Sequence, residues 1–303
     1  MSENFKIENT FLQQVLDSIN YNNKDNVRVE AGTAYSDYLY WDPILNQWKS
    51  NKGDDRIHIG SYSNEDSMQG ELAVSIGAYS GISNQGVGSV GVGAYKLGQA
   101  NETTSVGTFS AYIIQQEKAT SIGFAAGAIV QGTGAVAVGY EAGAYYQGAN
   151  SIAIGFSSAV SESSGDIGLG ENSISIGAHS SKYNNNNSNK ISIGYESGYN
   201  HQGSFSLAIG HQAGYTQQGY QAIAIGTGSG SINQGSYAIA IGGNAGQVNQ
   251  AEKSIVINGN GDSILNAANS GLYVAPIRVV NNVTGLKQLY YDPTTKEIVY
   301  YEP

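Results

Sequence analysis

Three acidic side chains that could carry out hydrolysis lie close together in the sequence, at Glu162, Asp166 and Glu171. Most glycoside hydrolases cleave a sugar linkage between two such carboxyl groups, one acting as the acid and the other as the base or nucleophile. The same residues are also ordinary members of a polar surface loop, and we favour that interpretation. An enzyme that cleaves surface polysaccharide is the alternative function that the sequence leaves open.

The remaining reactive residue types show no pattern typical of a catalytic or metal site. The chain has no cysteine, which excludes disulfides and thiolate metal sites. Glycine strings such as Gly86-Val87-Gly88 lack the lysine of a phosphate-binding loop, and the glycine-rich turns hold almost no Asp for calcium. The histidines do not have the H-E-x-x-H spacing; they are His58, His179, His201 and His211. We therefore predict no catalytic residue, no metal and no cofactor.

A short apolar motif recurs along most of the chain. Ser151-Ile152-Ala153-Ile154-Gly155 returns nearly unchanged before Gly210, Gly226 and Gly242, usually at a spacing of 16 residues. A Gln-Gly pair recurs in step with it. Such a unit is too short for two helices with their turns, but it can hold two short strands and two tight turns. Isoleucine and valine favour strands, and glycine supplies the positive φ angles that tight turns need.

Stacking of these units predicts an all-β parallel solenoid in which each repeat forms one coil. Coils stack at ~4.8 Å, so the rod is on the order of 60–70 Å long. Side chains alternate between the two faces of a strand. Small residues such as Ala153 then fit the narrow interior, and the larger Ile152 and Ile154 face outward.

The outward-facing isoleucines predict an oligomer. A ladder of large apolar side chains along a whole rod exceeds the apolar patch that soluble monomers expose. No helix is expected in the repeat region to cover it, so another copy of the same chain is the simplest cover. The number of copies does not follow from this reasoning.

Charge and hydropathy narrow the range of partners. The net charge is −10 and no Lys/Arg cluster occurs, which argues against nucleic acid. No run of about 18 apolar residues is present, so we expect no membrane insertion. The beginning of the sequence has no apolar signal-peptide core, and we therefore expect assembly in the cytoplasm of the cell that makes the protein.

The repeat resembles the head repeats of YadA-type trimeric adhesins, over about residues 56–258. This resemblance implies a left-handed parallel β-roll and a homotrimer. It also implies which side chains contribute to the trimer core: Ile152, Ile154, Ile209, Ile225 and Ile241. The signal peptide and membrane anchor of the bacterial members are not seen in this sequence, so we do not expect a bacterial autotransporter.

Similar Q-G-x-x-S-I-A-I-G arrays occur in fibre proteins of giant viruses and phages, followed by a tail similar to Gly271–Tyr300. This likeness implies a structural and adhesive fibre or spike on a virion surface or extracellular fibre. Its expected partners are its own copies, a virion or fibre base, and a cell-surface glycan or receptor.

The two ends of the repeat region share a second motif. Leu39-Tyr40-Trp41-Asp42-Pro43 matches Leu289-Tyr290-Tyr291-Asp292-Pro293, and each predicts a β-hairpin. We favour hairpins that cap the two ends of the roll over the alternative that one of them binds a neighbour in a fibre. Apolar residues at helical spacing predict a short helix over Asn9 to Asn20, acting as a trimer cap or as an anchor. The predicted domains are an N-terminal helix (1–24), a hairpin cap (25–55), β-roll repeats (56–260) and a C-terminal β cap (261–303).

Tyrosines at repeated positions form the candidate ligand-binding surface. Aromatic rings on a rod can stack on sugars, or they can pack on each other, and we favour packing. The residues concerned are Tyr183, Tyr199, Tyr215 and Tyr237.

Overall fold

The structure, a computed structural model, describes most of the chain between residues 39 and 300. The described residues are 39–42, 47–50, 56–63, 69–93, 96–161, 168–183, 187–261, 263–281 and 284–300. Every helix or strand assigned within these ranges is a β-strand, which confirms the all-β prediction for this part of the chain. The helix predicted over Asn9 to Asn20, and the domain 1–24 with it, lie outside the described residues.

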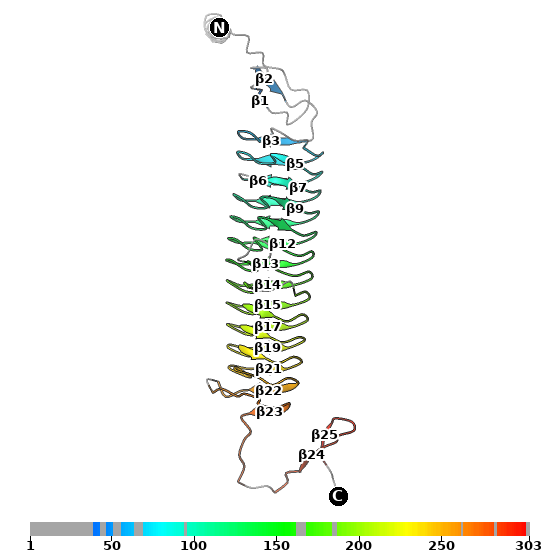
Figure 1. The fold of residues 1–303 in the computed structure, drawn as a ribbon, viewed down its shortest axis with the longest axis vertical. Coiled ribbons are helices and arrows are strands. Elements are labelled where there is room, and N and C mark those ends of the chain that lie inside the picture. Colours follow the sequence, from blue (N-terminus) through cyan, green and yellow to red (C-terminus); the bar gives the residue numbers. More distant parts are fainter. Residues whose placement is uncertain are drawn as a thin grey trace, which may run out of the picture.

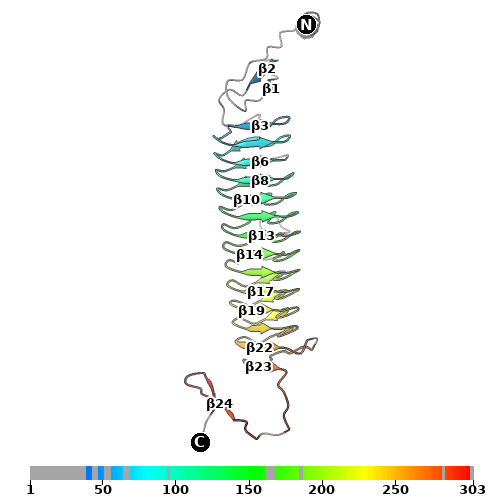
Figure 2. The ribbon, with the colours of Figure 1, turned by 180° about the vertical axis from the view of Figure 1, so that it is seen from behind.

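The repeated apolar motif forms a single parallel sheet of 14 strands. Figures 1 and 2 show from opposite sides that the coils stack one below another into an elongated rod. Each strand pairs with its equivalent in the next coil, so that Ile152 lies beside Ile174 and Ile154 beside Ile176. The strands are β3 (Ile57–Ile59), β4 (Val74–Ile76), β6 (Val90–Val92), β8 (Thr104–Val106), β10 (Thr120–Ile122), β12 (Val136–Val138), β13 (Ile152–Ile154), β14 (Ile174–Ile176), β15 (Ile191–Ile193), β17 (Leu207–Ile209), β19 (Ile223–Ile225), β21 (Ile239–Ile241), β22 (Ser254–Asn258) and β23 (Gly271–Ala275).

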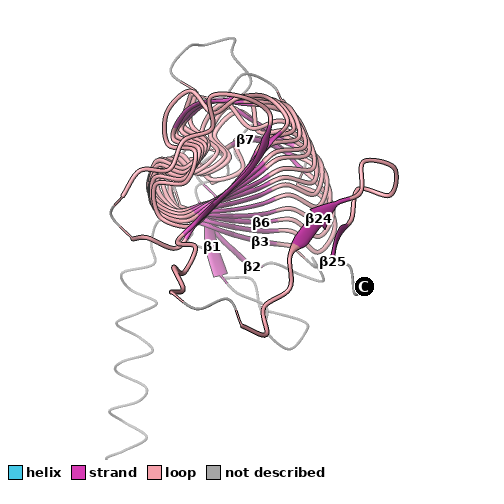
Figure 3. Ribbon diagram, turned by 90° about the horizontal axis from the view of Figure 1, so that it is seen from below, coloured by secondary structure: helices cyan, strands magenta, loops and turns pink. Residues whose placement is uncertain are grey.

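The Gln-Gly part of each repeat forms the opposite wall of the coil, which Figure 3 shows end-on. It contains a four-stranded and a three-stranded parallel sheet, continued by single bridges between Gln131 and Gln147 and between Gln147 and Leu169. The strands are β5 (Ser83–Gln85), β7 (Leu97–Gln99), β9 (Ile114–Gln115), β11 (Val130–Gln131), β16 (Asn200–Gln202), β18 (Thr216–Gln218) and β20 (Ile232–Gln234). The opposite wall thus has a strand in seven coils and single bridges in others, and the two stacked parallel walls confirm the predicted parallel solenoid.

A column of glycines ends the strands of the 14-stranded sheet. Gly123 has a φ of +130°, and a Cβ placed on it would lie 2.4 Å from the backbone oxygen of Gly139 in the next coil. That distance is shorter than any real Cβ contact, and the φ value is one that other L-residues rarely adopt. The repeat therefore requires glycine at this position for coils to stack.

The solenoid interior is narrow and filled by small residues. The middle residue of each strand points inward, and from β4 to β22 it is Ala, Ser, Gly or Val and buried, as at Ala153 and Val256. Strand alternation therefore works as predicted: the central small residue lies inside, and its larger neighbours point away from the interior.

Buried glutamines bridge the two walls, and this feature was not predicted. The side chain of Gln131 donates from Nε2 to the backbone oxygens of Thr120 (2.7 Å) and Ala135 (3.2 Å) on the opposite wall. Its amide also donates to Gln147 Oε1 at 3.3 Å and accepts from Gln115 Nε2 at 3.0 Å. We call this buried row the glutamine ladder; its described members are Gln69, Gln85, Gln99, Gln115, Gln131, Gln147, Gln202, Gln218, Gln234 and Gln250.

Two lysines are buried inside coils that depart from the 16-residue period. Lys96 donates from Nζ to Ser105 Oγ (2.5 Å) and to the backbone oxygens of Gly107 (3.0 Å) and Ser110 (3.1 Å). Lys190 Nζ has no hydrogen-bond partner among the described residues. Burial lowers the pKa of each amine from 10.5 to about 7. A long apolar stem thus fills space within coils of irregular length, and it brings a poorly solvated amine inside.

Both predicted hairpins form. Strands β1 (Leu39–Asp42) and β2 (Gln47–Ser50) pair antiparallel, and so do β24 (Leu289–Tyr291) and β25 (Ile298–Tyr300). Among the described residues, each of these strands pairs only with its hairpin partner. Capping of the roll by the hairpins is therefore not shown within one chain and stays a prediction.

Candidate functional site: the uncovered sheet face

The outer side of the 14-stranded sheet carries two columns of large side chains, which we call the apolar face. The first column contains the first outward residue of each strand: Ile57, Val74, Val90, Thr104, Thr120, Val136, Ile152, Ile174, Ile191, Leu207, Ile223, Ile239, Ile255 and Leu272. The second column contains Ile59, Ile76, Val92, Val106, Ile122, Val138, Ile154, Ile176, Ile193, Ile209, Ile225, Ile241, Ile257 and Val274. Only Thr104 and Thr120 interrupt the aliphatic character of the two columns.

The described residues leave this face partly exposed. Ile154 is 36% exposed and Ile241 is 39% exposed, whereas Ala153 between the two columns is fully buried. Adjacent strands hold these side chains in register, since Ile209, Ile225 and Ile241 follow one another in the same column. The face is therefore continuous and apolar along the rod.

All five residues proposed for a trimer core lie on the apolar face. Ile152 belongs to the first column, and the other four belong to the second. The proposal omitted the remaining members, for example Val90 and Leu272, although they hold the same repeat positions. The 16-residue period would have identified them, because the register of the sheet follows the period.

An aromatic column, which the sequence analysis did not single out, starts at the turn after the second apolar column. The rings of Phe124, Tyr140 and Phe156 stack nearly parallel, with centroids 5.3 and 5.2 Å apart. His179, Tyr195 and His211 extend the contacts in the following coils. The pKa of Tyr140 is raised, first by its hydrogen bond to Glu141 and then by that carboxylate's charge. In most of these coils the aromatic residue or His directly follows the strand-ending glycine, and His179 lies one residue further on; this repeated position is the signal that could have located the column.

The structure brings three of the four candidate ligand-binding tyrosines together. Tyr183 and Tyr199 meet edge to face at 4.9 Å, and Tyr199 stacks on Tyr215 at 5.0 Å. Burial, and then the hydrogen bond between Tyr199 and Tyr183, raise the pKa of Tyr199 to about 12. Lys182 Nζ lies 5.1 Å from the centre of the Tyr183 ring.

Tyr237 belongs to a separate group, in which it meets Tyr220 edge to face at 5.7 Å. Tyr220 meets Phe205 in the same manner at 5.7 Å. Parallel stacking, as between Tyr199 and Tyr215, uses ring faces that a sugar would otherwise contact. The perpendicular rings around Tyr220 leave more face area for a ligand.

The residues considered for hydrolysis and metal binding are not assembled into a site among the described residues. Glu171 is exposed, and Glu162 and Asp166 lie outside the described residues. His201 lies on β16, whereas His211 lies in a turn and stacks on Tyr195. Within the part of the chain that the structure describes, no group of three or more His, Cys, Asp or Glu side chains could hold a metal ion.

The fold and the apolar face define the class of protein: a parallel β-solenoid whose broad sheet is left uncovered by the described residues. The chain matches no protein-family profile, and no curated protein is similar to it in sequence. Among the described residues, no helix has the length and apolar character needed to cross a bilayer.

Proposed function

We propose that three copies of the chain associate side by side through the apolar face and form a homotrimeric, left-handed β-roll. The observation that carries this proposal is the apolar face itself, two columns of mostly aliphatic side chains over 14 strands. Moving one half-exposed Ile out of water is worth roughly 1 kcal/mol. The contribution repeats with each coil, so the whole face favours association strongly.

The number of copies and the hand of the roll come from the resemblance to YadA-type head repeats. An identical repeat in every chain lets each copy present the same columns to a common axis. Figure 3 shows coils of similar shape that turn progressively from one end of the rod to the other. A trimer therefore matches both the repeat and the uncovered face.

The assembled rod serves as a structural and adhesive fibre or spike module on a virion surface or extracellular fibre. Support comes from the elongated shape, the low charge content of 13% and the likeness of the repeats and tail to viral fibre proteins. In this role one end attaches to a virion or fibre base, and the rod contacts a cell-surface glycan or receptor. No observation on the described residues favours the alternative of a polysaccharide-cleaving spike, and two of its three candidate residues, Glu162 and Asp166, lie outside them.

The mass in solution, measured by light scattering, tests the assembly. We expect a species near three times 31.8 kDa. Ile225→Asp combined with Ile241→Asp should dissociate it, because association would then bury adjacent unpaired carboxylates. A matched control is Ile114→Asp with Ile232→Asp, which makes the same change at exposed positions on the opposite wall. A monomeric parent chain would refute the proposal.

Binding to immobilised glycans and to host cells tests the adhesive role. The parent trimer should bind with higher avidity than the dissociated double variant, since three linked sites act together. Equal binding by both forms, or no binding by the intact rod to any surface glycan or cell, would contradict an adhesive function.

A further inference from the structure

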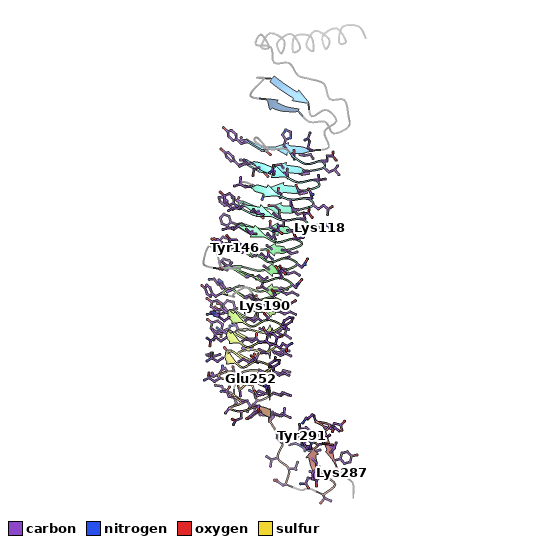
Figure 4. All side chains as sticks on the ribbon, turned by 45° about the vertical axis from the view of Figure 1, so that its right-hand side comes forward. Lys118, Tyr146, Lys190, Glu252, Lys287 and Tyr291 are labelled. Carbon is purple, nitrogen blue, oxygen red and sulfur yellow. The ribbon has the colours of Figure 1, made fainter. Side chains whose placement is uncertain are left out.

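The chain continues past the last coil as a tail, residues 276–281 and 284–300, that exposes large apolar side chains. Ile277 is 74% exposed and Val279 is 87% exposed. Figure 1 shows the tail running below the last coil, and Figure 4 places Lys287 and Tyr291 on it, clear of the coils. The other large apolar residues with exposed side chains are Val280, Leu286, Leu289, Tyr290, Tyr291, Ile298, Val299 and Tyr300.

The hairpin within the tail has no strand partner elsewhere among the described residues. Strands β24 and β25 pair only with each other, and all six residues in them are exposed. An isolated two-stranded hairpin is at best marginally stable in water. The hairpin is nevertheless rich in aromatic and β-branched residues, and removing their side chains from water would lower the free energy. A surface from outside the described part of this chain must therefore cover them.

The tail leaves the rod at the apolar face. Its first residue, Pro276, follows directly after β23, whose Leu272 and Val274 continue the two columns to the end of the sheet. Both side chains are exposed. The edge of β23 away from β22 also has no strand partner among the described residues. Wherever neighbouring copies meet on this face, the tail emerges at the border of that contact.

We propose that the tail of each copy packs on the last coils of a neighbouring copy and closes the lower end of the assembly. This inference rests on the proposed function, because it requires copies that share the apolar face. The occupant is a second copy rather than the tail's own rod for two reasons. The tail runs away from its own coils, and its exit point adjoins the surface that a neighbour covers.

The experiment uses the full chain with one photo-reactive benzoylphenylalanine, which replaces Val279 in the tail, Ile225 on the apolar face, or Ile232 on the opposite wall. After irradiation, a denaturing gel separates products that join two chains from unchanged single chains. We expect products of twice the chain mass from positions 279 and 225, and none from position 232. Peptide mapping of the position 279 product should place the second chain's cross-link in its last coils.

The outcomes separate the two proposals. A monomeric mass with no interchain product from position 225 would overturn the proposed function and this inference with it. A trimeric mass with interchain product from position 225, but with position 279 linked only to its own chain or to nothing, would overturn the tail inference alone. Interchain linkage of position 279 to coils far from the lower end would also overturn it.

Discussion

Gly123 explains why glycine follows the strand of the 14-stranded sheet in each coil from β3 to β21. Its φ is +130°, and the next coil's backbone oxygen occupies the place of a side chain. By contrast, Gly88 has a φ of +64°, and a Cβ placed on it would have no other atom within 4 Å. Both glycines have a positive φ, but only at Gly123 would a Cβ also collide with the neighbouring coil. Comparing the two positions therefore distinguishes the cost of the collision from the cost of the turn conformation.

Gly123→Ala should destabilise the solenoid by about 3 kcal/mol or more, because the backbone must shift as well as adopt a strained φ. Gly88→Ala should cost only about 1 kcal/mol, the usual penalty for a left-handed non-glycine residue. Denaturant unfolding of both variants and the parent measures the difference. Equal losses would show that coil stacking does not impose the glycine.

The burial of Lys190 destabilises the folded chain by an amount that depends on pH. Burial lowers its pKa in the folded chain to about 7, below the 10.5 expected for the unfolded chain. Between these values the unfolded chain binds more protons, so the lysine's contribution to stability rises as pH increases from about 7 to 10.5. Below about pH 7 both states are protonated, and the full penalty of burying the charge remains.

Lys190→Met should therefore raise the free energy of unfolding at pH 7 by about 2 kcal/mol, with a smaller gain at pH 10. Lys96→Met should gain less, since it also removes three hydrogen bonds from Nζ. Urea unfolding of the parent and both variants at the two pH values checks this. A Lys190→Met chain that is less stable than the parent at pH 7 would contradict the argument.

At the scale of the strand, the glutamine ladder ties one wall of the solenoid to the other. Each amide reaches across the interior to backbone oxygens at the start of the opposite strand, as Gln234 does to Ile223 (2.8 Å) and Ala238 (3.5 Å). The amides also bond to each other along the rod, for example Gln218 to Gln234 at 3.0 Å. Leu169 replaces glutamine in one coil and packs on Ala142, Ala153 and Ala159 instead.

Gln131→Leu should cost about 2–4 kcal/mol, because it leaves the backbone oxygens of Thr120 and Ala135 without this partner in a buried interior. Gln116→Leu, at an exposed neighbouring position, is the control and should be nearly neutral. Thermal unfolding of the two variants measures the difference. The ladder would be dispensable if Gln131→Leu were as stable as the control.

The sequence was sufficient to predict coils, strand faces and turns, because the alternation around Ala153 and the regular glycines are local and periodic. It did not reveal that the Gln of each Gln-Gly pair points inward, since polar residues are ordinarily exposed and the period alone does not assign an inner face. The burial of Lys96 and Lys190 was not predicted for the same reason. The aromatic column at Phe124 was missed although its position repeats, because several residue types share it.

At the scale of the whole molecule, the apolar face and the net charge act in opposite directions. The face favours association of copies, whereas a charge of −10 on each chain opposes it. From Ser197 to Ala251 the chain has no charged residue, so ion pairs cannot join this part of one copy to the same part of another. Burial of apolar side chains is then the interaction that holds this part of one copy against the same part of another.

Association should therefore persist when salt is raised from about 0.05 to 1 M NaCl, and at low protein concentration it should become stronger. Salt screens the repulsion between like-charged chains and leaves apolar burial in place. Light scattering across this salt series, at a fixed low chain concentration, reports the mass directly. Dissociation on adding salt would mean that ion pairs hold the copies together, and the apolar face would then not be the contact surface.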